Sequence, residues 1–189
     1  MLKTLRNIVI FIAFLLGLRW LYVTNTTIEF SRFKLSYESL PETFDGFKIA
    51  HVSDVHNTRS RKKIDAIYEN LQTEQPDIIA ITGDLIDSRV TDVSAALQFV
   101  QGLTEIAPCY YVTGNHESRL DEETFRYLLD GLIELGVTVL RNDARTIAKD
   151  GEEISIAGVD DPQFKKIGKK IDRVFFSNTI NELVATEKF

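Results

Sequence analysis

Five side chains of the types that bind divalent metal ions follow three short apolar runs. They are Asp54, His56, Asp84, Asn115 and His116. Asp54 and His56 are two positions apart, so both side chains point to the same side of an extended chain. Carboxylate oxygen, amide oxygen and imidazole nitrogen together suit Zn, Mn or Fe. Taken alone, such a short motif more often marks a solvated turn with a capping side chain.

The regular spacing of these residues indicates that they meet at one edge of a sheet. Asp84 lies 30 residues after Asp54, and Asn115 lies 31 residues after Asp84. A βαβ unit takes roughly 30 residues, so three parallel strands would bring these side chains together. Ligand sites of open α/β sheets lie at that carboxyl edge. Gly83 and Gly114 allow the chain to turn sharply where strand meets loop.

Apolar periodicity predicts the elements that position the five side chains. Core strands are expected at residues 47–53, at residues 78–82 and from Pro108 onward. A helix follows each strand, and the expected N-caps are Ser60, Thr91 and Asp121. The first helix is expected at residues 61–74, and Gly136 ends the third. This alternation of strands and helices predicts an α/β fold.

The remaining segments are expected to complete the sheet system. Residues 28–37 alternate apolar and polar side chains, which predicts an edge strand with a bulge. After the third helix, a meander of three short strands is predicted at residues 137–140, 145–148 and 153–157. Residues 165–173 are expected to form a solvated basic loop. Ser177 or Asn178 is expected to cap a last helix.

The order Asp-x-His, Gly-Asp and Gly-Asn-His-Glu resembles the calcineurin-like metallophosphoesterase superfamily, and most closely its bacterial, membrane-associated branch. The resemblance covers roughly residue 28 to the end, and the three motifs together are specific. It implies a layered α/β fold, a sheet sandwich flanked by helices. It also implies hydrolysis of phosphomonoester, phosphodiester or diphosphate bonds by a hydroxide that two divalent ions activate.

The resemblance implies a role for each of the five side chains. Asp54 and His56 would bind the first metal, and Asp84 would bridge both. Asn115 would bind the second metal through its side-chain oxygen. His116 would be catalytic and would stabilise charge on the phosphate or protonate the leaving oxygen. Four other polar residues are expected to be structural: His51 in strand packing, Asn57 and Arg59 in a solvated loop, and Asp160 in a turn.

The family also supplies ligands from later histidines, including a Gly-His-x-His motif. This sequence has three histidines, and none follows His116. We therefore expect residues 47–189 to form a domain that is incomplete at its C-terminus and lacks C-terminal strands. Two ions (Mn, Zn, Fe or similar) are expected in the complete enzyme, and one in this chain. A nucleotide-diphospho-lipid hydrolase and an inactive, membrane-tethered remnant are the alternatives that the sequence leaves open.

Residues 1–23 have the composition of a membrane signal anchor. Lys3 and Arg6 precede an apolar run that begins at Ile8. The predicted membrane segment covers residues 8–23. The alternative is an apolar helix packed on the domain. Residues 24–46 are expected to form a linker and the edge strand. The positive charges before the anchor favour a single-pass protein with its domain on the extracytoplasmic side.

Composition limits the partners of the chain. The formal net charge of −6 argues against a nucleic-acid-binding face. A phosphate ester is the expected substrate, and the anchor makes a lipid-linked one plausible.

Cys109 is the single cysteine, so it cannot form an internal disulfide. Its apolar surroundings predict a buried strand thiol.

Overall fold

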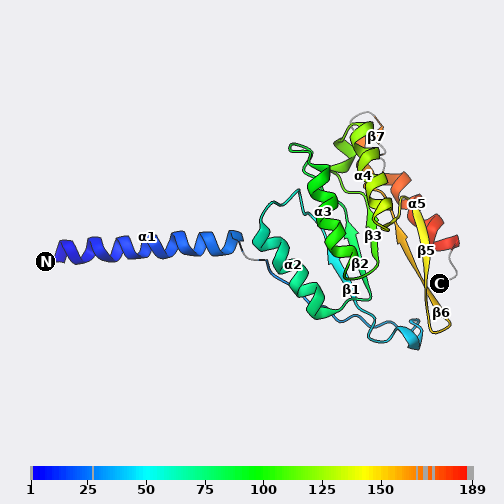
Figure 1. Ribbon diagram of the computed structural model, residues 1–189, viewed down its shortest axis with the longest axis horizontal. Coiled ribbons are helices and arrows are strands. Elements are labelled where there is room, and N and C mark those ends of the chain that lie inside the picture. The colour runs from blue at the N-terminus through cyan, green and yellow to red at the C-terminus, as the bar shows by residue number, and fades with distance from the viewer. Residues whose placement is uncertain (1, 27, 165, 168–169, 172, 187–189) are drawn as a thin grey trace.

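The computed structural model describes residues 2–26, 28–164, 166–167, 170–171 and 173–186 (Figure 1). Its centre is a sheet of four parallel strands in sequential order. These are β1 (Ile49–Val52), β2 (Ile78–Thr82), β3 (Cys109–Val112) and β4 (Thr138–Val139). The helices that connect them are α2 (Arg61–Glu74), α3 (Val93–Thr104) and α4 (Glu122–Glu134). The predicted α/β fold with a parallel sheet and flanking helices is confirmed.

The three connecting helices cover the same face of the sheet (Figure 1), as right-handed crossovers between neighbouring parallel strands require. The core between helices and sheet is built from fully buried apolar side chains, among them Ile79, Ile81, Tyr111, Val100, Leu103, Leu128 and Leu132. On the other face of β1, Ile49 is 58% exposed. His51 also lies on this exposed face and contacts Thr82 Oγ1 through Nε2 at 2.6 Å. The expectation that His51 is packed inside the sheet is therefore wrong.

Two of the three predicted helix caps are correct. Ser60 accepts the main-chain N–H of Lys63, and Asp121 accepts that of Thr124. The cap of α3 is Asp92 rather than Thr91, because the Asp92 carboxylate accepts the N–H of Ala95 and the helix begins one residue later than expected. Carboxylates and hydroxyls are both good N-caps, so adjacent Thr and Asp residues leave the start ambiguous in the sequence.

The predicted edge strand at residues 28–37 is wrong. This segment has no regular secondary structure, and a short 3-10 helix, η1 (Glu42–Phe44), follows it. Phe33 is 85% exposed, and Leu35 and Tyr37 are also exposed. A strand needs a neighbour for its backbone N–H and C=O groups, and no strand of the described residues pairs with this segment.

The predicted meander is also wrong in its connections. Its first strand became β4, which pairs in parallel with β3 in the main sheet. The other two form a hairpin of seven-residue strands, β5 (Asp143–Lys149) and β6 (Glu152–Gly158). The elements after the hairpin are η3 (Pro162–Phe164), β7 (Lys166–Ile167), β8 (Lys170–Ile171) and α5 (Arg173–Thr186). The basic segment thus contains a short strand pair, and α5 begins before the expected caps Ser177 and Asn178; residues 165, 168–169 and 172 lie outside the described ones.

The N-terminal helix α1 (Leu2–Thr26) extends away from the α/β part of the chain (Figure 1). Its residues 3–23 are long and apolar enough to cross a membrane and make no buried contact with the domain. At 1.5 Å per residue, 21 residues span about 32 Å, close to the roughly 30 Å hydrocarbon core of a bilayer. In this structure α1 does not pack on the domain, and the membrane anchor stays a prediction.

Candidate metal centre

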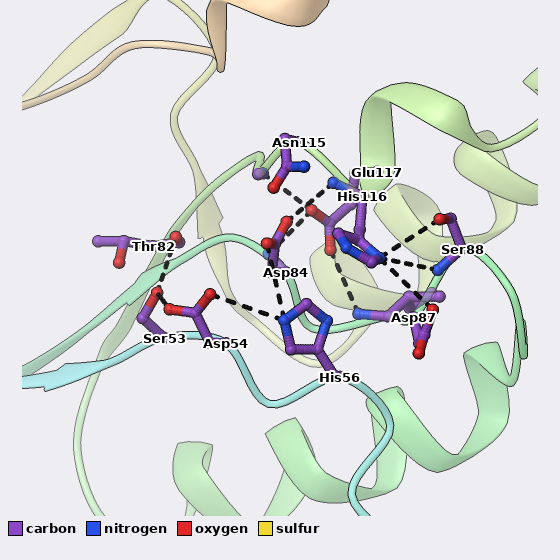
Figure 2. Close-up of polar contacts among 12 residues, drawn as sticks. Ser53, Asp54, His56, Thr82, Asp84, Asp87, Ser88, Asn115, His116 and Glu117 are labelled. Carbon is purple, nitrogen blue, oxygen red and sulfur yellow. Dashed lines mark hydrogen bonds and ion pairs between the residues drawn. The ribbon is translucent and has the colours of Figure 1, made fainter.

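The loops after β1, β2 and β3 bring the predicted site residues together at the carboxyl edge of the sheet (Figure 2). The Nε2 atom of His56 lies 3.6 Å from Asp54 Oδ1 and 3.8 Å from Asp84 Oδ2. His56, Asp84 and His116 each offer a ligand atom within 4.8 Å of the others. Asn115 lies on the far side of Asp84 from His56 (Figure 2).

Four residues of these loops have left-handed backbone conformations. The φ angles are 56° at Asp54, 46° at His56, 52° at Asn57 and 52° at Asp84. For residues with a Cβ atom such conformations cost on the order of 1–3 kcal/mol each and cluster at functional sites. The sequence motif indicates the residue types here but gives no sign of this strain.

Main-chain hydrogen bonds between the loops hold the strained turns in place. The N–H of His56 donates to the carbonyl of Asp84 at 2.9 Å, and that of Asn57 donates to Leu85 at 2.9 Å. The Asn57 side chain is 8% exposed, donates to the Asp92 carbonyl and accepts from the N–H of Asp87. The expectation of a solvated Asn57 is therefore wrong. Arg59 is exposed and pairs with Asp92, as a surface residue does.

Glu117 is a buried carboxylate beneath the site, with 1% of its surface exposed. Its Oε2 accepts the main-chain N–H groups of Asp84 at 2.9 Å and Gly114 at 2.8 Å. Its Oε1 accepts the N–H of Ile86 at 3.3 Å. One carboxylate thus fixes the two loops that carry Asp84 and Asn115. Sequence reasoning missed this role, although Glu117 directly follows the Asn-His pair.

Two glycines allow these two loops to approach each other closely. A Cβ atom on Gly83 would lie 2.3 Å from the Cα of Gly114, and Gly83 also has a φ of +78°. A Cβ atom on Gly114 would lie 2.3 Å from Asp84 Oδ1. The expectation of a sharp turn holds for Gly83, whereas Gly114 is needed because the Asp84 carboxylate fills the space beside it.

His116 lies against His56, with ring centroids 4.5 Å apart. The main-chain N–H of Ser88 donates to His116 Nδ1 at 3.1 Å. Since Nδ1 is the acceptor, the proton of the neutral ring lies on Nε2. The Asp87 carboxylate lies 3.6 Å from Nδ1, beyond hydrogen-bonding distance. The Arg89 N–H donates to Asp87, and this bond holds the pKa of that carboxyl below its ordinary value.

The donor set fits a divalent metal ion. His56 Nε2 is too far from both carboxylates for a hydrogen bond, and its buried Nδ1 has no hydrogen-bond partner among the described residues. Ligand atoms bound tetrahedrally at 2.0–2.2 Å lie about 3.3–3.6 Å apart. The 3.6 Å separation of His56 Nε2 from Asp54 is of this size, and the 3.8 Å separation from Asp84 is slightly longer, so each carboxylate is placed to share a cation with His56.

A second polar cluster attaches the β5–β6 hairpin to the end of β3. Asp160 is buried, accepts the hydroxyl of Thr113 at 2.7 Å and pairs with Arg141 through two guanidinium nitrogens. The Arg141 guanidinium also lies over the rings of Phe125 and Phe164. The turn expected at Asp160 is thus a buried anchor directly behind the loop of Asn115.

The predicted buried thiol of Cys109 is confirmed, and burial raises the pKa of that thiol to about 12.

Comparisons with known proteins agree with this site. A family model described as calcineurin-like phosphoesterase matches residues 47–178. A transmembrane protein with metallophosphoesterase domain from Bos taurus is 33% identical over 144 residues, 72% of this chain and 31% of the relative. An uncharacterized metallophosphoesterase from Aquifex aeolicus is 28% identical over 163 residues, 85% of this chain and 59% of the relative. The phosphodiesterase YaeI from Escherichia coli is 31% identical over 120 residues, 61% of this chain and 44% of the relative. This chain therefore spans less than two thirds of the length of each of these relatives.

Proposed function

Because this chain belongs to the calcineurin-like phosphoesterase family, we propose that its strand-end cluster binds divalent metal ions for the hydrolysis of phosphate esters. The proposed ligands are Asp54, His56, Asp84 and Asn115. The observation that carries the proposal is the convergence of two carboxylates on the His56 Nε2 atom at 3.6 and 3.8 Å. A hydrogen-bonded surface cluster would instead share protons at shorter distances.

Asp84 is the proposed bridging ligand, because it lies between His56 on one side and Asn115 on the other. The main-chain N–H of His116 donates to Asp84 Oδ1 at 2.9 Å and holds the carboxylate in this orientation. A bound pair of divalent ions supplies Lewis acidity toward the phosphoryl oxygens and lowers the pKa of attacking water.

His116 is proposed to stabilise charge on the phosphate or on the leaving oxygen by donating a hydrogen bond. Its Nδ1 accepts the N–H of Ser88, so the neutral ring carries its proton on Nε2 and donates a hydrogen bond from there. A protonated Nε2 has no lone pair for a metal ion, which supports a role in catalysis rather than in metal binding. The hydroxyl of Ser88 also lies 3.3 Å from Nδ1 and helps to hold the ring.

We propose that residues 1–23 tether the phosphoesterase domain, residues 47–189, to a membrane through the linker at 24–46. The spanning length of α1 and the transmembrane name of the Bos taurus relative support this arrangement. A phosphodiester is a suitable first substrate class, since the Escherichia coli relative is named a phosphodiesterase. A tethered domain also meets lipid-linked phosphate esters without diffusion through solution.

Calorimetric titration of the detergent-solubilised chain with Mn²⁺ or Zn²⁺ tests the metal centre. We expect one ion to bind, and Asp84→Asn to weaken binding at least about tenfold, since ligand changes of this kind cost more than 1.4 kcal/mol. Asp65→Asn is the matched control, because Asp65 pairs with Arg61 on α2, outside the proposed metal centre. A wild-type chain that binds neither ion, or an Asp84→Asn variant that binds as the wild type does, would contradict the proposal.

A further inference from the structure

Arg119 lies beside the proposed metal centre, on the 3-10 helix η2 (Glu117–Arg119). Its Nη2 atom is 2.9 Å from the side-chain amide of Asn115. The same amide also approaches Asp84, 2.8 Å from Oδ2 and 3.3 Å from Oδ1. No carboxylate among the described residues forms an ion pair with Arg119. The guanidinium and the proposed metal ion therefore meet at one amide group.

When no cation is present, only one orientation of the Asn115 amide lets both its nitrogen and its oxygen form hydrogen bonds with Asp84 and Arg119. With its nitrogen toward Asp84, it donates to the carboxylate and its oxygen accepts from Arg119. A metal ligand must instead turn its oxygen toward Asp84, since only the oxygen has lone pairs for a cation. The amide nitrogen then faces the guanidinium, donor against donor. Metal ligation by Asn115 and its hydrogen bond to Arg119 therefore exclude each other.

The backbone around the amide is fixed, so rotation of the side chain is the available change. The N–H of Gly114 is held by Glu117. The hydroxyl of Ser118 donates to the main-chain carbonyl of Asn115 at 2.8 Å. The N–H of Arg119 donates to the carbonyl of His116 at 3.1 Å. Arg119 itself is exposed, so its guanidinium can swing away without disturbing the core.

We propose that Arg119 couples metal binding to phosphate binding, an inference that rests on the proposed metal centre. In the metal-free chain, the guanidinium holds the Asn115 amide with its oxygen turned away from Asp84. A cation at Asp84 takes the amide oxygen and releases the guanidinium, which then binds a phosphate oxygen beside the metal. A guanidinium suits this task, because its parallel N–H groups match the geometry of phosphate.

The metal affinity of Arg119→Ala tests the competition directly. Since the guanidinium stabilises the metal-free orientation, its removal should raise the affinity of the weak second position, at Asp84 and Asn115, about two- to tenfold for Mn²⁺ that binds beyond the first ion, the effect of one lost competing hydrogen bond. Asn115→Asp provides the matched background, because a carboxylate can give one oxygen to the metal and the other to Arg119. In that background Arg119→Ala removes only a positive charge, so the gain in affinity should be smaller.

The binding of inorganic phosphate to the Mn²⁺-saturated chain tests the second half of the proposal. Arg119→Ala should weaken this binding at least about tenfold, as the loss of a charge-assisted hydrogen bond does. Equal gains in metal affinity in both backgrounds, or an unchanged phosphate affinity, would overturn the inference and leave the metal centre standing. A wild-type chain that binds no Mn²⁺ would overturn the metal centre and this inference with it.

Discussion

At the scale of single residues, the buried carboxylate of Glu117 is the part of the site with the clearest energetic consequence. In Glu117→Gln, an NH₂ group replaces one of the two acceptor oxygens, so at least one of three main-chain N–H groups loses its partner. A buried unsatisfied donor costs about 1–3 kcal/mol. We expect the free energy of unfolding to fall by about this amount, measured by urea denaturation in detergent with near-ultraviolet circular dichroism.

Glu69→Gln is the control for Glu117→Gln, because Glu69 is exposed on α2. This substitution should change the free energy of unfolding by no more than about 0.5 kcal/mol, as surface substitutions generally do. Equal unfolding free energies for the two variants would show that Glu117 does not hold the loops. The same measurement on metal-saturated protein should show a larger difference for Glu117→Gln, since bound metal stabilises only the intact site.

Residue types and spacing were sufficient to predict the proposed ligands but not their support. Asp54, His56 and Asp84 carry chemistry that stands out in a sequence, and their spacing matches βα units. Glu117 and Asn57 act by accepting or donating main-chain hydrogen bonds across loops about 30 residues apart in the chain. Such contacts depend on loop conformations with positive φ, which no residue type specifies except glycine.

At the scale of elements, the contact between the loops after β2 and β3 sets the geometry of the site. Gly114→Ala would place a Cβ atom 2.3 Å from Asp84 Oδ1 and 2.4 Å from the Asp84 nitrogen. Because the second neighbour is main chain, the loop itself must shift. We expect a loss of Mn²⁺ affinity of at least about tenfold by calorimetry. Gly17→Ala, with open space around it, should bind Mn²⁺ as the wild type does, and an unaffected Gly114→Ala would contradict the expected close approach.

The N-cap of α4 makes part of its stability dependent on pH. Hydrogen bonds from the N–H and hydroxyl of Thr124 hold the pKa of Asp121 below its ordinary value. A depressed carboxyl pKa contributes stability that is present above the unfolded-state pKa and is lost as pH falls through the folded-state pKa. We expect Asp121→Ala to lower stability at pH 7 and to have a smaller effect at pH 3, by urea denaturation.

Asp121→Asn separates the charge from the cap, since an asparagine caps a helix but does not titrate. Its stability relative to the wild type should therefore rise as the pH is lowered from 7 to 3. A difference between Asp121→Asn and the wild type that does not change with pH would contradict the assignment of this pH dependence to Asp121.

Helices and core strands were predictable, because the periodicity of their apolar residues is local. Which strands pair with each other was not predictable. The predicted strand at residues 78–82 and helix at residues 61–74 coincide with β2 and α2. The alternation at residues 28–37 has the same appearance as a strand, yet no neighbour pairs with it in the described structure. Similarly, the strand predicted at residues 137–140 pairs in parallel with β3 rather than with the hairpin.

At the scale of the whole molecule, the proposed anchor α1 would set the side of the membrane on which the domain lies. Lys3 and Arg6 precede the spanning segment, so we expect the N-terminus in the cytoplasm and the domain outside. Protease added to intact cells should digest the domain, and a chain without residues 1–23 should fractionate without detergent. A domain that resists external protease but is digested after lysis would show the opposite orientation, and a full chain that is soluble without detergent would contradict the anchor.

The number of ligands in this chain predicts its activity. The proposed ligands Asp54, His56 and Asp84 would be enough for one ion, because three protein ligands and water make a workable open site. A second ion would have Asp84 and the neutral amide of Asn115, a weak pair in which the carboxylate is shared. Without the second ion, attacking water loses one activating charge and the phosphate loses part of its clamp. We therefore expect residues 1–189 to bind a single Mn²⁺ or Zn²⁺ weakly and to show little turnover.

Assays of an aryl phosphodiester across a metal titration check this expectation, with this chain compared with a longer form that carries the later histidine ligands of the family. The longer form should turn the substrate over, because added imidazoles complete the second metal position. Asp84→Asn in the longer form should abolish turnover, since both ions depend on that carboxylate, whereas Asp65→Asn should not. Full activity of residues 1–189, or activity of the longer form that survives Asp84→Asn, would place the reacting centre elsewhere than at the carboxyl edge of β1 and β2.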